Sequence, residues 1–186
     1  ARKGQHDQAV ARFKAATESD TGFALAFARL GLSHWELGFD AEAQRASSRA
    51  VELSDGLAPA DRYFVLATDA TIRNDTGKAI KYYRQLVEAA PSDTAMRLEL
   101  ASALESTGDL EGAREHLAKV LAADPKDVNA LLAAGRVEIL RGSPKTSLES
   151  LNSALTLAIE LRNDHARASA LQAIGVAYKN LGNPED

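Results

Sequence analysis

The spacing of hydrophobic and polar positions along the chain predicts a series of amphipathic helices. Apolar residues recur three or four positions apart, as at Ala79, Tyr83 and Leu86, and mostly polar residues fill the positions between them. On a helix this spacing places the apolar side chains along one face, which can be buried against a neighbour. We expect helices at about residues 6–19, 23–37, 40–53, 59–73, 76–89, 94–107, 110–122, 128–141, 144–162 and 165–181.

One apolar phrase returns several times, which indicates an internal repeat. It reads alanine, three residues, a large apolar residue, two residues and a further apolar residue, as at Ala113, Leu117 and Val120. A pair that ends in a small residue precedes each phrase. These pairs are Leu30-Gly31, Leu66-Ala67, Leu100-Ala101, Ala134-Gly135 and Ile174-Gly175, and successive pairs lie 36, 34, 34 and 40 residues apart. A period of this length indicates a supersecondary unit that stacks on its neighbours.

The residue types of the repeat suit two helices that pack as a hairpin. A small residue such as Gly31 or Ala101 lets the two helices approach closely, and a later small residue such as Ala43 does the same from the second helix. Larger residues such as Leu117 fill the space between hairpins. One hairpin cannot bury its apolar face alone, so the hairpins must stack.

Turn residues separate the predicted helices where the repeat requires them. Gly108-Asp109 and Gly142-Ser143-Pro144 lie within hairpins, where glycine ends one helix and aspartate or serine-proline opens the next. Ala90-Pro91 and Asp124-Pro125 lie between hairpins and end the preceding helix.

These features resemble the tetratricopeptide repeat family along essentially the whole chain. The family signature is Trp-x2-Leu-Gly-x2-Tyr, then Ala-x3-Phe, then Pro over a 34-residue period, and residues 94–127 match it best. The resemblance implies an all-α fold, a right-handed α-solenoid of stacked antiparallel helical hairpins with about ten helices. The expected domain organisation is one array with units at about 1–22 (second helix only), 23–55, 58–91, 92–125, 126–163 and 164–186 (first helix only).

Departures from the signature carry further expectations. His34 replaces the signature tyrosine and Ser47 replaces a large aromatic residue, so the hairpin at 23–53 is expected to pack less tightly than the one at 94–122. The 40-residue interval implies a longer helix that ends near Arg162, as in extended repeats of bacterial signalling proteins. More loosely, the chain resembles the tetratricopeptide segments of bacterial eukaryotic-like serine/threonine kinases. Both ends look cut from a longer array.

The resemblance also implies a partner-binding groove on the concave side, lined by the first helices of the hairpins. Chaperone-tail binding is disfavoured, because Ala28, Leu32, Val65, Ala95 and Glu99 stand where such proteins carry a carboxylate clamp. We expect apolar anchors near Phe64 and Leu98, oriented by the charges around them. The predicted groove residues are Arg29, Leu32, Glu36, Asp61, Phe64, Thr68, Leu98, Glu99, Ser102, Arg136 and Gln172.

Composition and motifs argue against chemistry in this chain. It has no cysteine, and its histidines, His6, His34, His116 and His165, are isolated from one another. Gly77-Lys78 lacks the upstream glycine of a phosphate loop. We therefore predict no enzyme activity, no catalytic residue, no metal and no cofactor. Asn74-Asp75-Thr76 fits the pattern of a glycosylation acceptor, which matters only in a secreted eukaryotic protein.

The expected function is that of a scaffold whose groove binds a peptide or a partner protein. The alternative is a regulatory or substrate-recruiting segment of a larger signalling protein, a kinase or a transcriptional regulator, whose catalytic domain lies elsewhere. A net charge of -4 with dispersed basic residues disfavours nucleic acid. Insertion into a membrane is not expected, because no apolar run is long enough. We expect a soluble segment, with the cytoplasm as the favoured compartment, and end-to-end self-association through uncapped terminal hairpins.

Overall fold

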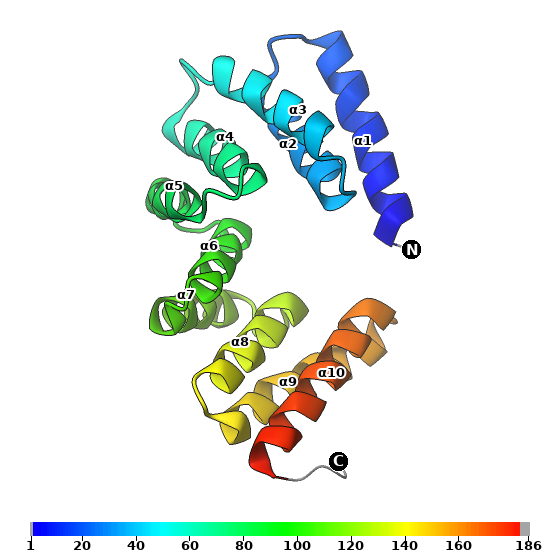
Figure 1. The fold of residues 1–186 in the computed structure, drawn as a ribbon, viewed down its shortest axis with the longest axis vertical. Helices are drawn as coiled ribbons and strands as arrows, with labels where there is room; N and C mark the ends of the chain where they lie inside the picture. Colours follow the sequence, from blue (N-terminus) through cyan, green and yellow to red (C-terminus); the bar gives the residue numbers. More distant parts are fainter. Residues whose placement is uncertain (1, 183–186) are drawn as a thin grey trace. The chain divides into compact units, whose positions relative to one another are not determined.

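The computed structural model describes residues 2–182, with side chains from residue 7 onward, and this part of the chain folds into ten α-helices without a strand (Figure 1). His6 and residues 183–186 lie outside the described side chains. The predicted all-α class is confirmed. The helices are α1 (Arg2–Ser19), α2 (Ala24–Glu36), α3 (Asp40–Glu52), α4 (Pro59–Ile72), α5 (Thr76–Ala89), α6 (Thr94–Ser106), α7 (Leu110–Ala123), α8 (Val128–Leu140), α9 (Pro144–Glu160) and α10 (Asp164–Leu181).

The predicted helices agree closely with the observed ones, apart from the first and the ninth. Helix α1 begins at Arg2, four residues before the predicted start at 6. Helix α9 ends at Glu160 and not at 162, because Arg162 adopts a left-handed conformation with φ of 52°. It is still a long helix of 17 residues, as the 40-residue interval in the sequence predicts.

The helices form two compact units, unit 1 (Ala1–Asp93) and unit 2 (Thr94–Asp186). Unit 1 contains α1 and the hairpins α2/α3 and α4/α5, and unit 2 contains the hairpins α6/α7 and α8/α9 followed by α10. The two helices of each hairpin run antiparallel and pack along their length (Figure 1). A single continuous array of six repeat units stays a prediction.

A common turn joins the two helices of each hairpin. Gly108 has φ of 82°, which lets Asp109 N–H donate to Leu104 O at 3.0 Å across the end of α6. This is the bond that closes a helix ended by a left-handed residue. Gly38 and Gly142 adopt the same conformation, with φ of 80° and 76°. In the hairpin α4/α5 the position is taken by Asn74, with φ of 57°, since asparagine tolerates this region better than most residues.

Side-chain caps fix the start of several helices. Asp127 precedes α8, and its Oδ1 accepts hydrogen bonds from Asn129 N at 2.9 Å and Ala130 N at 3.0 Å. Asp75 and Asp109 cap α5 and α7 in the same way. These carboxylates satisfy amide groups that have no partner within the helix, and they also face the positive end of the helix dipole.

Replacing Asp127 by alanine should lower the free energy of unfolding by about 1 kcal/mol, because two amides at the start of α8 lose their acceptor. Urea unfolding followed by far-UV circular dichroism measures the change. Asp127→Asn is the matched control and should retain most of the stability, since asparagine caps a helix about as well as aspartate. Equal losses in the two variants would contradict a capping role.

Small residues set the closest contacts between helices. A Cβ built on Gly31 would lie 3.2 Å from Ala43 O and 3.3 Å from Ser47 N, both on α3. A Cβ on Gly135 would lie 2.4 Å from the Leu151 side chain on α9. The sequence prediction that small residues allow the two helices of a hairpin to meet therefore agrees with the structure at both glycines.

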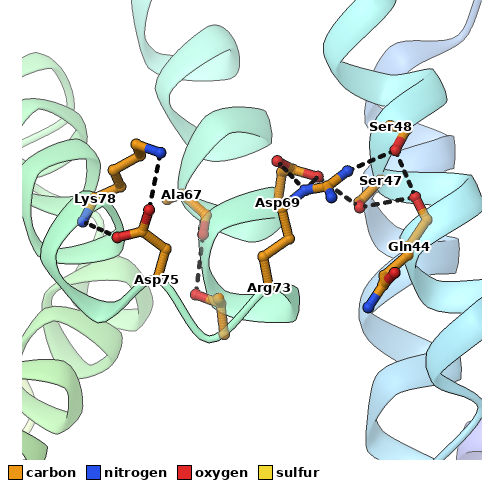
Figure 2. A network of polar contacts seen from close by, with 9 residues as sticks. Gln44, Ser47, Ser48, Ala67, Asp69, Arg73, Asp75 and Lys78 are labelled. Carbon is orange, nitrogen blue, oxygen red and sulfur yellow. Dashed lines mark hydrogen bonds and ion pairs between the residues drawn. The ribbon is translucent and has the colours of Figure 1, made fainter.

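A polar network joins α3 to α4 within unit 1 (Figure 2). The buried Ser47 hydroxyl donates to Asp69 Oδ1 at 2.7 Å. Arg73 Nε contacts both oxygens of the same carboxylate, at 3.0 and 2.9 Å, and Arg73 Nη2 donates to Ser48 Oγ at 2.7 Å. Ser47 therefore forms a buried hydrogen bond at the position where the repeat signature has a large aromatic residue. The looser packing predicted for this hairpin stays a prediction.

An ion-pair network joins α7 to α8 within unit 2. Arg141, which follows α8, contacts Glu111 of α7 through Nε at 2.9 Å and Glu138 of α8 through Nη1 at 3.0 and 2.9 Å. The hydrogen bond from Arg141 is the main cause that lowers the pKa of Glu111 below its ordinary value. Burial opposes this effect, and Arg114 adds to it.

The lowered pKa of Glu111 makes the stability of unit 2 depend on acidic pH. A carboxylate with a depressed pKa in the folded state stabilises that state above its unfolded pKa, which for glutamate is about 4.3, and the contribution is lost as the pH falls through the folded value. The urea midpoint should therefore fall less steeply below about pH 4.3 in Glu111→Gln than in the parent chain. Parallel slopes in the two proteins would contradict the proposed role of the pair.

Candidate functional site

A groove of about 380 Å³ lies within unit 2 and is lined by residues of α6, α8 and α10. Helix α8 provides one wall, α10 provides the other, and the end of α6 closes one side. The lining residues are Glu105, Leu132, Arg136, Ile139, Leu140, Ser169, Gln172, Ala173 and Val176.

The walls of this groove are mainly apolar and partly exposed. Leu140 at the end of α8 is 59% exposed, and Val176 of α10 is 42% exposed. Leu132 is buried and belongs to the core of unit 2, where it packs with Leu151 of α9 and other apolar residues. Core packing thus holds the floor of the groove in place, while the rim presents aliphatic side chains to solvent.

One ion pair joins α6 to α8 at the side of the groove that α6 closes. Arg136 Nε donates to Glu105 Oε1 at 3.1 Å, and Arg136 Nη2 donates to Glu105 Oε2 at 3.0 Å. The Glu105 side chain is 15% exposed, whereas that of Arg136 is 47% exposed. This two-point geometry orients the guanidinium and neutralises its charge, because each nitrogen faces one carboxylate oxygen.

The structure places only part of the predicted groove in this hollow. Arg136 and Gln172 line it, and their role in binding a partner stays a prediction. Leu98, Glu99 and Ser102 lie on α6 of the same unit but do not line it. Leu98 is half-buried, and Glu99 and Ser102 are exposed. Their role in binding a partner stays a prediction.

The other predicted residues lie in unit 1, on α2 and α4. Arg29 is exposed, and its guanidinium carbon lies 4.5 Å from the centre of the Phe64 ring, a cation–π contact. Phe64 and Thr68 are buried, and an apolar anchor near Phe64 stays a prediction. Leu32 and Asp61 are half-buried and Glu36 is exposed.

The sequence prediction missed the aliphatic side chains that give the groove its character. Ile139, Leu140 and Val176 follow Arg136 and Gln172 by about one helical turn on the same face of α8 and α10. Continuing the 3.6-residue period from the predicted positions would have found them. These aliphatic side chains look like ordinary core residues in a sequence, and only the structure shows that Leu140 and Val176 are exposed.

Other motifs take structural roles where the structure describes them. Gly77-Lys78 lies in the first turn of α5, where Lys78 N donates to the capping Asp75 at 3.1 Å. The half-buried His34 packs edge-on against Phe39, with ring centres 6.1 Å apart, and the neighbouring Trp35 is exposed. Residues 7–182 contain no group of three or more metal-binding side chains that could hold an ion.

The fold is that of a helical-hairpin repeat protein. Residues 70–138 match the model of the tetratricopeptide repeat family, which supports that family over this segment. BBS4 of Bos taurus, a member of the BBSome complex, is 34% identical over 73 residues. This match covers 39% of the chain and only 14% of BBS4.

Solved structures with the same fold cover most of the chain. YrrB, a TPR protein with an unusual peptide-binding site, superposes with a TM-score of 0.63 at 24% identity, covering 91% of this chain and 84% of YrrB. The TPR2B domain of yeast Sti1, in a complex with pHsp70, gives a TM-score of 0.61 at 22% identity, covering 65% of this chain and 97% of that one. A chain of the APC/C assembly Cut9–Hcn1 gives 0.75 at 19% identity, covering 97% and 34%. These likenesses show the fold alone.

Proposed function

We propose that this chain is a protein-interaction scaffold that binds a peptide or partner protein in the groove between α8 and α10. The observation that carries the proposal is a hollow with exposed aliphatic rims on a core-supported floor. Apolar concave sites with a few polar groups are the usual form of a binding site. The complex of the Sti1 TPR2B domain with pHsp70, in which a domain of the same fold binds a partner, supports the same interpretation.

A pull-down with two matched double variants tests this function. The groove variant carries Leu140→Ser and Val176→Ser, and the control variant carries Ile159→Ser and Leu161→Ser, which lie outside the groove in the same unit and are 54% and 66% exposed. Proteins retained by the parent chain should be retained by the control and lost with the groove variant. If the parent chain, the groove variant and the control variant all retained the same partners, those partners would bind outside the groove.

The same groove would serve in a larger signalling protein, where this chain would recruit a substrate or regulate a kinase or a transcriptional regulator. The long helix α9, which resembles the extended repeats of signalling proteins, favours this context. The domain order of the full-length gene tests it: a neighbouring catalytic or DNA-binding domain would support a regulatory role, and the lack of one would leave the scaffold. Within residues 2–182, no helix is both long and apolar enough to cross a bilayer.

Self-association has a specific candidate surface on α10. Gly175 stands where Gly135 stands in α8, yet a Cβ on Gly175 would have no neighbour within 4 Å, and Leu171 one turn earlier is 49% exposed. In unit 1, α1 carries the second-helix phrase at Ala9 and Phe13, which are only half-buried. Helix α10 thus has the sequence pattern of the first helix of a hairpin, and α1 has that of the second. We therefore propose that α1 of a second copy packs against α10.

Sedimentation over a range of concentrations tests this association. Leu171→Glu should abolish any concentration-dependent rise in mass, because it places a charge on the surface that α1 would cover. Leu161→Glu, at an exposed site on the other side of the turn before α10, should leave the rise unchanged. A chain that stays monomeric at all concentrations would rule out the association.

A further inference from the structure

We infer that the groove between α8 and α10 selects an uncharged segment that inserts two aliphatic side chains. This inference rests on the proposed function and adds the class of ligand. It follows from the charge state of the groove, from its volume and from the polar groups at its rim.

The charge of the groove is already compensated. Arg136 is the only basic lining residue and Glu105 the only acidic one among the described residues that form the groove, and the two make a two-point ion pair. An acidic ligand would meet a guanidinium already held by Glu105, and it would also approach that carboxylate. A basic ligand would approach Arg136 in the same way. Like charges in apposition reduce affinity, so the groove complements a segment without charge.

The volume fixes the size of the inserted group. An apolar cavity of about 150 Å³ holds one benzene-sized group. A groove of about 380 Å³ therefore accommodates two aliphatic side chains rather than one. Leu140 and Val176, which are exposed in the described structure, would be covered by these side chains, and covering exposed apolar area drives association.

Polar groups at the rim suit the backbone of the ligand. Gln172 of α10 is exposed and carries both an amide donor and a carbonyl acceptor. Ser169, about one turn earlier on α10, adds a hydroxyl. Such groups can pair with the amides and carbonyls of an uncharged peptide, which have to be satisfied once water is displaced.

Selection from a phage library of random 12-residue peptides tests the inference. The parent chain is the bait, and the groove variant defined above is used for counter-selection. Enriched peptides should carry two aliphatic residues without a charged residue next to them. The best peptide is then synthesised, together with versions that carry glutamate or lysine beside the aliphatic pair, and binding is measured by fluorescence anisotropy. Each charged version should bind at least about fivefold more weakly.

A substitution that releases Arg136 provides the decisive comparison. Glu105→Gln keeps the size of the side chain but removes its charge, so the affinity for the glutamate-bearing peptide should rise relative to the affinity for the uncharged peptide. The control double variant should behave as the parent chain with every peptide.

The outcomes separate the inference from the function on which it rests. Enrichment of acidic or basic peptides that depend on Leu140 and Val176 would overturn the inference and leave the scaffold function standing. The inference would also be overturned if the selection enriched no peptide whose binding depends on Leu140 and Val176. The pull-down, which presents folded partners, would then decide the proposed function on its own.

Discussion

Replacing Leu151 by alanine should lower the free energy of unfolding by about 3 kcal/mol, the largest change that we expect from a single substitution in this chain. Leu151 of α9 has 0% of its surface exposed and contacts the core of unit 2. Its truncation removes buried methyl groups and leaves a space that the rigid helix pair cannot close. Urea unfolding monitored by far-UV circular dichroism reports this change.

Ile159→Ala is the matched control for that substitution, because it truncates an aliphatic residue on the same helix. Ile159 is exposed, so its loss should cost no more than about 0.5 kcal/mol. Hydrogen exchange should also show faster opening of α8 and α9 in Leu151→Ala. If the two variants lost equal stability, the assignment of Leu151 to the core would be incorrect.

Gly135→Ala should destabilise the protein, whereas Gly175→Ala should stabilise it, although both glycines end the same type of pair in the repeat, Ala134-Gly135 and Ile174-Gly175. Alanine improves helix propensity by about 1 kcal/mol at either site. At Gly135 the new Cβ would meet Leu151 Cγ and Cδ2 at 2.4 Å, and overpacking costs about 1–3 kcal/mol. At Gly175 the new Cβ would have no neighbouring atom within 4 Å, so only the gain in helix propensity remains. The two unfolding free energies should differ by about 2 kcal/mol.

A double-variant cycle identifies the contact responsible. In the background of Leu151→Ala, the side chain that obstructs Gly135→Ala is gone, so the same alanine should become neutral or stabilising. Additive effects of the two substitutions would show that the cost at Gly135 arises from some other neighbour.

The helices were predictable because their signals are local and repeated. The apolar period, the turn glycines and the prolines each mark a helix boundary, and most predicted ends agree with the observed ones to within one or two residues. The start of α1 was missed because residues 2–5 are polar and give no apolar period. The end of α9 was missed because arginine rarely adopts the left-handed conformation seen at Arg162.

The site was predictable only in part, because exposure depends on neighbours that the period does not specify. Thr68 occupies the same position of the repeat as Arg136, yet Thr68 is buried. Phe64 and its equivalent Leu132 are both buried, but the Arg29 side chain lies over the Phe64 ring. Arg136 stays accessible at the groove, where Glu105 reaches it from α6. Equivalent positions in the sequence thus carry different surroundings.

Asn74 shows how freely the connections of this chain can be exchanged. It adopts the same left-handed backbone conformation as Gly38, Gly108 and Gly142. The turn between the two helices of a hairpin therefore accepts asparagine as well as glycine at this position. For protein engineering, cuts at two successive bends of this kind would remove one repeat length, namely the second helix of one hairpin together with the first helix of the next.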